Sequence, residues 1–207
     1  MEEKFTQKEE HILKVALDVF LEKGLHGTKM QEIADRAGVN KAMLHYYFRS
    51  KERLYAMIFE KLFLKFMNAM ADSFRPEQNF AATLRHFVGT FIDSMRENPR
   101  LPLFVARELS WGGATVQKIM HDLVEQKAVK SPQIMIDELR KAERRGEIRA
   151  GFSPIQFIFT LIGACVYPFV ARPIAEALFP DLLDDWDTLI EQRKEAVFDL
   201  LYNGLKK

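Results

Sequence analysis

The chain has 207 residues, of which 48% are hydrophobic and 29% are charged, so it exceeds one small domain and can bury a substantial core. Its net charge of +1 excludes a protein that coats nucleic acid nonspecifically through an overall positive excess. Because it has one cysteine, Cys165, and shows no signal peptide or anchor motif, we expect a protein of the reducing cytoplasm.

The first predicted helix covers roughly residues 5–23, and Gly24 closes it. Its apolar residues recur at helical spacing: Ile12, Val15, Ala16, Val19 and Phe20. This helix is expected to form one small core with the two short helices that follow it.

Those two short helices are joined by a four-residue turn. Thr28, with Gln31 three positions later, predicts a capping box at the start of the first of them. Gly38 can take the left-handed conformation at little cost, so we predict that it ends this helix at Ala37 and redirects the chain. Asn40 is then the expected N-cap of the second short helix.

The second short helix has two different faces. Leu44 and Phe48 are four residues apart, so they share an apolar face that must pack on the preceding helix. The opposite face carries Lys41, Ala42, Met43, His45, Tyr46 and Tyr47. Such groups donate to phosphates, hydrogen-bond base edges and contact thymine methyls in the major groove, so the pattern predicts a DNA-binding helix-turn-helix. The alternative is an ordinary capped hairpin with two half-buried surface tyrosines.

Residues 12–54 resemble the N-terminal DNA-binding domain of the TetR family of bacterial transcriptional regulators. The positions that fit the family's pattern without a gap are Ala16, Phe20, Gly24, Thr28, Ile33, Ala34, Ala37, Gly38, Val39, Leu44, Tyr46, Phe48, Lys51 and Leu54. The match covers about a fifth of the chain position by position, and the rest agrees in outline. It implies a helix-turn-helix DNA-binding domain at residues 1–50 and an effector-binding and dimerisation domain at residues 51–207.

The same resemblance assigns phosphate contacts to Thr28, at a helix N-terminus, and to Lys51, as a positive charge. Lys41 and Tyr46 would bind phosphates or reach bases. The family often has tyrosine where this chain has His45, so the base preference is open, since imidazole accepts or donates according to its protonation. The complete predicted DNA-binding set is Thr28, Asn40, Lys41, Ala42, Met43, His45, Tyr46, Tyr47 and Lys51.

From residue 51 onward the sequence reads as one helix after another, with no alternating strand pattern. The expected helices cover residues 51–74, 79–97, 101–111, 114–128, 132–145, 153–171 and 187–204. Short connections between helices predict an all-α protein whose C-terminal part is a helical bundle.

The segment 155–171 carries no charge over seventeen residues. A membrane span needs about 20 apolar residues, whereas this run is shorter, contains Pro168 and is followed at once by Arg172. A helix that is apolar all round is otherwise buried, so we expect no membrane partner. The TetR resemblance implies a homodimer in which the helices 153–171 and 187–204 of two subunits form a four-helix bundle. Two-fold symmetry also suits a palindromic operator in double-stranded DNA.

The middle helices are rich in Phe and Met. Such stripes at helical spacing fill the cores of bundles. By the family resemblance, they also suit a pocket for a small, apolar or aromatic effector. The candidate lining residues are Phe63, Phe66, Met67, Phe87, Phe91, Phe104, Arg107, Met120, His121 and Tyr167.

The sequence therefore predicts a sequence-specific transcriptional regulator, a repressor by resemblance to the family, that a bound effector releases from its operator. The alternative is a DNA-binding dimer without a small-molecule ligand, controlled by a protein partner. Enzymatic activity is not expected, because no glycine-rich loop follows a strand and no Ser-His-Asp neighbourhood is visible. Neither a cofactor nor a metal is expected, because the five histidines lack metal-ligand spacing.

Overall fold

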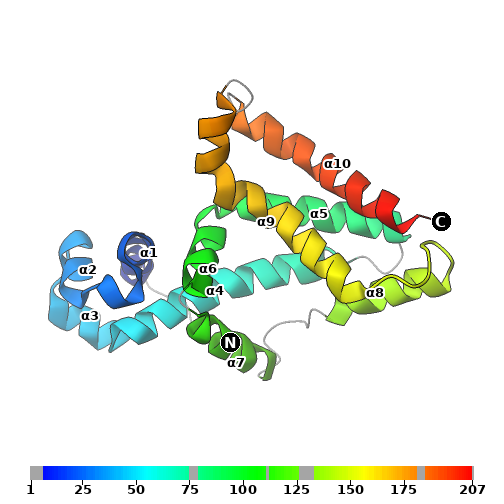
Figure 1. Ribbon diagram of the computed structural model, residues 1–207. Helices are drawn as coiled ribbons and strands as arrows, with labels where there is room; N and C mark the ends of the chain where they lie inside the picture. The colour runs from blue at the N-terminus through cyan, green and yellow to red at the C-terminus, as the bar shows by residue number, and fades with distance from the viewer. Residues whose placement is uncertain (1–6, 75–78, 111, 126–132, 181–184, 207) are drawn as a thin grey trace. The chain divides into compact units, whose positions relative to one another are not determined.

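The computed structural model describes residues 7–74, 79–110, 112–125, 133–180 and 185–206, and over these ranges it contains helices and no strands (Figure 1). The helices are α1 (Gln7–Gly27), α2 (Met30–Arg36), α3 (Lys41–Phe48), α4 (Lys51–Asp72), α5 (Phe80–Glu97), α6 (Arg100–Ser110), α7 (Ala114–Glu125), α8 (Gln133–Arg144), α9 (Pro154–Leu178) and α10 (Trp186–Leu205). The predicted all-α class is confirmed.

The helices form two compact units. The described residues of Met1–Leu64 and Leu103–Leu123 form unit 1, and those of Lys65–Pro102 and Val124–Lys207 form unit 2. The chain passes from one unit to the other within α4, within α6 and again near the end of α7. The domain boundary at residues 50 and 51 stays a prediction.

Unit 1 has the three-helix core that the apolar periodicity predicts. Ile12 and Phe20 of α1, Ile33 of α2, and Leu44 and Phe48 of α3 are all fully buried. The α1 helix is broken at Gly24, whose φ of 70° is non-helical, although helical residues continue to Gly27. Residues 5 and 6 of the first predicted helix lie outside the described residues, as do residues 111, 126–128 and 132 of three later ones.

In unit 2, α5 packs against α8, α9 and α10. Its contact with α10 is reinforced at the surface, where Lys194 Nζ lies 2.9 Å from Asp93 Oδ1. Arg85 pairs with Glu195 and also lies over the Phe198 ring, 3.8 Å from its centroid. These polar contacts lie at the edge of the packing between α5 and α10.

The α9 helix continues to Leu178, so the expected end at residue 171 is wrong, and neither Pro168 nor Pro173 interrupts it. Proline has no N–H, so Pro168 leaves the carbonyl of Ala164 without its helical donor. Arg193 of α10 supplies a donor instead, with its Nη2 3.1 Å from the Ala164 oxygen. A partner from a neighbouring helix thus lets α9 pass through a proline.

By length and composition alone, α9 is the one helix among the described residues that is apolar enough to cross a membrane. Only 28% of its most apolar window is buried. One helix of this kind is a weak indication, because core helices of soluble proteins pass the same test. Burial raises the pKa of the Cys165 thiol on this helix to about 12, so the thiol is protonated and unreactive at neutral pH.

The bond across Pro168 can be tested by a double-mutant cycle. Arg193→Met should lower the free energy of unfolding by about 1–3 kcal/mol, because it leaves a carbonyl oxygen without a donor. In a Pro168→Ala background the restored N–H serves Ala164, so the same substitution should cost at least about 1 kcal/mol less. Urea unfolding at one fixed protein concentration measures all four proteins.

Arg140→Met, at an exposed position of α8, is the matched control and should change the free energy by no more than about 0.5 kcal/mol. Equal losses from Arg193→Met in both backgrounds would show that the arginine does not compensate for the proline.

Candidate functional site

The turn between α2 and α3 has the geometry that its glycine predicts. Gly38 has a φ of 65°. Its N–H donates to the Asp35 carbonyl at 3.3 Å, and the N–H of Val39 donates to the Ala34 carbonyl at 3.0 Å. This pair of bonds is the Schellman motif, which satisfies the last carbonyls of a helix. The predicted role of Gly38 is confirmed.

The start of α3 is also as predicted. Asn40 precedes the helix in an extended conformation, and its Oδ1 accepts a hydrogen bond of 2.6 Å from the Met43 N–H. An N-cap of this kind contributes about 1 kcal/mol. The Asn40 side chain is therefore engaged by the helix that it caps.

The capping box predicted for α2 is wrong. The helix begins at Met30 with Lys29 as its N-cap, and no side chain caps it. The Thr28 hydroxyl donates instead to the Gly24 carbonyl at 2.6 Å, and Gln31 donates to Asp35 at 2.7 Å. The last carbonyls of a helix have no intrahelical partner, so the end of α1 offers the Thr28 hydroxyl an acceptor.

Two residues predicted to bind phosphate lie at this junction. Thr28 is only 1% exposed, so its hydroxyl faces the protein. The Nζ of Lys51 donates to the carbonyls of His26 and Thr28, each at 3.3 Å. The Lys51 ammonium is thus held against the segment that joins α1 to α2.

The structure brings most of the predicted DNA-binding side chains together on α3. Lys41, Ala42, His45 and Tyr46 are exposed, and Tyr46 is 73% exposed although it is a large aromatic residue. Met43 and Tyr47 are half-buried. The ring centroids of Tyr46 and Tyr47 lie 5.5 Å apart in an edge-to-face arrangement. This surface combines a positive charge, hydrogen-bonding groups and apolar atoms within two helical turns.

The end of α3 holds a feature that the sequence did not reveal. Arg49 has φ 65° and ψ −59°, and it is the one non-glycine residue with positive φ among the described residues. Its carbonyl oxygen lies 2.9 Å from His45 Nδ1. No glycine, asparagine or aspartate marks this position, so residue type gave no signal of the turn.

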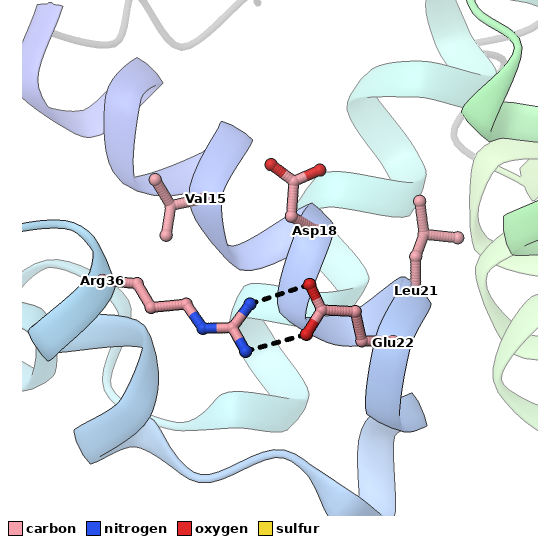
Figure 2. A pocket seen from close by; sticks show the side chains of 5 residues that line it. All are labelled: Val15, Asp18, Leu21, Glu22 and Arg36. Atoms are coloured by element: carbon pink, nitrogen blue, oxygen red, sulfur yellow. Dashed lines mark hydrogen bonds and ion pairs between the residues drawn. The ribbon is translucent and has the colours of Figure 1, made fainter.

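Ion pairs hold α1 and α2 together. Arg36 donates two hydrogen bonds of 2.8 Å to the Glu22 carboxylate (Figure 2) and a third, of 2.9 Å, to Glu32. Lys23 also pairs with Glu32, at 2.6 Å. The hydrogen bonds from Arg36 hold the pKa of Glu22 below its usual range. Val15, Asp18, Leu21, Glu22 and Arg36 line a shallow hollow of about 500 Å³ at this place.

Within unit 1, α6 is joined to both α1 and α4 by polar contacts. Arg107 donates from Nη1 to the Leu21 carbonyl, three residues before the break in α1. The Tyr55 hydroxyl of α4 donates to Glu108 at 2.7 Å. Burial, together with the Glu108 carboxylate, raises the pKa of Tyr55. Arg107 was predicted to line an effector pocket. The pairing of Tyr55 with Glu108 had no signal in the sequence, because more than fifty positions separate the two residues.

The residues predicted to line an effector pocket fall in both units. In unit 2, the rings of Phe66 and Phe91 lie 4.9 Å apart and those of Phe87 and Phe91 lie 6.2 Å apart. In unit 1, Phe63 and Phe104 each lie against Phe59.

The other members of the predicted set have different surroundings. Met67 of α4 and Met120 of α7 are half-buried, while His121 of α7 is exposed. Tyr167 of α9 is 67% exposed. The structure therefore joins three of the predicted lining residues in one aromatic cluster of unit 2 and places Tyr167 on the surface.

Comparison with known proteins gives a consistent result. Residues 12–58 match the family described as bacterial regulatory proteins, tetR family. Over 204 residues the chain is 28% identical to the HTH-type transcriptional regulator RutR of Escherichia coli, a match that covers 96% of this chain and 91% of RutR. A match of 103 residues at 33% identity covers 48% of the chain and 47% of the HTH-type transcriptional repressor NicS of Pseudomonas putida.

The fold is likewise similar to solved structures. The transcriptional regulator FadR from Bacillus subtilis, solved in complex with stearoyl-CoA, superposes with a TM-score of 0.69 at 18% identity. The alignment covers 95% of this chain and 98% of FadR. At this identity the likeness establishes the fold alone.

The turn before α3 can be tested with two glycines. Gly38→Ala should lower the free energy of unfolding by about 1–2 kcal/mol, because a Cβ is disfavoured at its positive φ even where space is free. Gly89→Ala, inside α5 and also with free space, should raise it by about 0.5–1 kcal/mol. Thermal or urea unfolding measures both, and a stabilised Gly38→Ala variant would contradict the assigned turn.

Proposed function

Because the chain belongs to the TetR family of bacterial regulatory proteins, we propose that this DNA-binding transcriptional regulator is a repressor that acts as a homodimer in the cytoplasm. It binds a palindromic operator through α3 and leaves it when a small effector binds the C-terminal part of the chain. The observation that carries the proposal is the exposed face of α3, which follows a turn fixed by Gly38 and Asn40.

The exposed residues on that face assign the contacts. Lys41 provides a charge for the phosphate backbone, whereas His45 and Tyr46 provide groups for base edges or phosphates. Ala42, and the half-buried Met43 and Tyr47, complete the apolar part of the surface. Asn40 acts through its cap, and Lys51 places a charge beside the backbone of the α1–α2 junction.

Selection of bound sequences from randomised duplex DNA, at a stated salt concentration, tests this assignment. We expect an inverted repeat, since two-fold dimers bind two-fold sites. Lys41→Ala should weaken binding to all sequences and reduce the slope of log K against log salt by about 1. Lys118→Ala, which removes an exposed lysine from α7, is the matched control and should leave the slope unchanged. Failure to enrich any sequence would contradict the proposal.

The proposed dimer is supported by apolar side chains that α9 exposes. Ile155, Phe159 and Ile162 follow one another at helical spacing, and Ile174 and Leu178, which are four residues apart, are exposed as well. Exposed apolar surface that is contiguous marks a site of protein association. On α10, Leu200 is exposed in the same way. We therefore assign the dimer interface to the helices predicted at residues 153–171 and 187–204.

Phe159→Lys should convert the dimer to a monomer at micromolar concentration, because it places a charge in the centre of the proposed interface. Light scattering during size-exclusion chromatography gives the mass. Gln117→Lys adds the same charge at an exposed position of α7 and should leave the mass unchanged. A Phe159→Lys variant that remains dimeric would exclude this face of α9.

The proposed effector is an apolar or aromatic molecule. Unit 2 contains adjoining rings of Phe66, Phe74, Phe87 and Phe91, side chains that suit such a ligand. FadR, which has this fold, holds stearoyl-CoA. An effector lowers DNA affinity only by binding more tightly to the conformer that does not bind DNA, so operator DNA must weaken effector binding by the same factor.

The proposed route of coupling is through α4 and α6, two of the three helices that belong partly to each unit. α4 begins at Lys51, directly after the DNA-binding helix-turn-helix. The contacts of Arg107 with Leu21 and of Glu108 with Tyr55 join α6 to α1 and α4. An effector that displaces either helix would therefore alter the position of the DNA-binding helices.

One observation favours the alternative, control by a protein partner. Leu103 and Leu109 of α6 and Val124 of α7 are exposed apolar residues on the middle helices. Isolated exposed residues of this kind are common on protein surfaces. Control by a protein partner is thus supported only by these three side chains. Control by a small effector is supported by the aromatic cluster of unit 2.

A further inference from the structure

The turn after α3 is strained. The φ of 65° and ψ of −59° at Arg49, together with a 2.7 Å bond from the Ser50 N–H to the Phe48 carbonyl, define a γ-turn of the rare positive-φ kind. Such a conformation costs about 1–3 kcal/mol and persists only where the surroundings hold it. His45 is one of the groups that hold it, because its Nδ1 lies 2.9 Å from the Arg49 carbonyl oxygen.

This contact determines which ring nitrogen of His45 carries the proton. A carbonyl oxygen only accepts hydrogen bonds, so Nδ1 must be the donor. In neutral imidazole the other nitrogen, Nε2, is then an acceptor. Since His45 is exposed on α3 and its Nδ1 is engaged, Nε2 is the ring nitrogen that remains for DNA.

We propose that His45 is a specificity-determining residue that accepts a hydrogen bond from a base amino group, which is the N6 group of adenine or the N4 group of cytosine. The inference rests on the proposed function, in which α3 lies in the major groove. In the major groove, guanine and thymine present acceptor oxygens where adenine and cytosine present amino groups. Phosphate oxygens are acceptors as well, so an accepting Nε2 can hydrogen-bond to none of these oxygens. Neutral His45 therefore selects adenine over guanine, or cytosine over thymine, at one position of each half-site.

The test removes single atoms from the DNA. Once selection has given the preferred operator, each adenine of a half-site is replaced in turn by purine, which lacks the N6 amino group, and each cytosine by pyrimidin-2-one, which lacks the N4 amino group. At neutral pH we expect one position at which the analogue weakens binding by wild-type protein about 5- to 150-fold, the equivalent of about 1–3 kcal/mol.

The protein variants identify the partner of that amino group. His45→Ala should bind the natural and the substituted duplex with equal affinity at this position, because the acceptor is gone. His45→Gln, whose amide both donates and accepts, should show a smaller difference than wild type. His11→Ala, which removes an exposed histidine from α1, should keep the full effect. The helical content of each variant is checked by circular dichroism.

The outcomes separate this inference from the proposed function. If an operator is selected but no amino group on it matters to wild type, or if the loss persists in His45→Ala, the assignment of His45 is overturned while the DNA-binding assignment of α3 stands. If no sequence is selected at all, both are overturned.

Discussion

The fold depends on side chains that donate hydrogen bonds to main-chain carbonyls at places where a helix is broken. A helix leaves its last carbonyls without intrahelical partners, and this chain also breaks α1 at Gly24 and removes a donor from α9 at Pro168. Side chains fill these positions in each case. Thr28 donates to the Gly24 carbonyl, Arg193 to the Ala164 carbonyl and His45 to the Arg49 carbonyl. The bonds determine how one helix leads into the next.

This dependence explains which parts of the fold sequence reasoning predicted well. Helix boundaries set by local chemistry were predicted correctly, as at Gly38 and Asn40, where a residue type alone satisfies the neighbouring backbone. Errors arose where the deciding partner lies elsewhere. Thr28 matched a capping box, in which its hydroxyl would accept from an N–H of α2, but the hydroxyl donates to a carbonyl of α1 instead. The helix predicted at residues 153–171 continues to Leu178, past Pro168 and Pro173, and at Pro168 the replacement donor, Arg193, comes from another helix. Periodicity contains no information about such partners.

The residues of the candidate site also differ in how well a sequence pattern predicts them. The exposed face of α3 follows from the three-helix pattern, because burying Leu44 and Phe48 turns Lys41, His45 and Tyr46 outward. The effector residues do not follow from a pattern, since Phe and Met at helical spacing specify only that a side chain is apolar. Which rings meet depends on how helices pack, so Phe66, Phe87 and Phe91 form a cluster while Tyr167 lies at the surface.

The strengths of these contacts bear on the proposed release from DNA. The three-helix core is fully buried and apolar, so it moves as one piece. The hydrogen bonds of Arg107 with Leu21 and of Tyr55 with Glu108, in contrast, are polar contacts, each with a net contribution of about 1 kcal/mol. Coupling between two binding sites is commonly about 1–3 kcal/mol. The free energy of breaking these two hydrogen bonds is therefore similar in size to the coupling free energy that the proposed effector must supply. Such a change would leave the three-helix core of the DNA-binding domain intact.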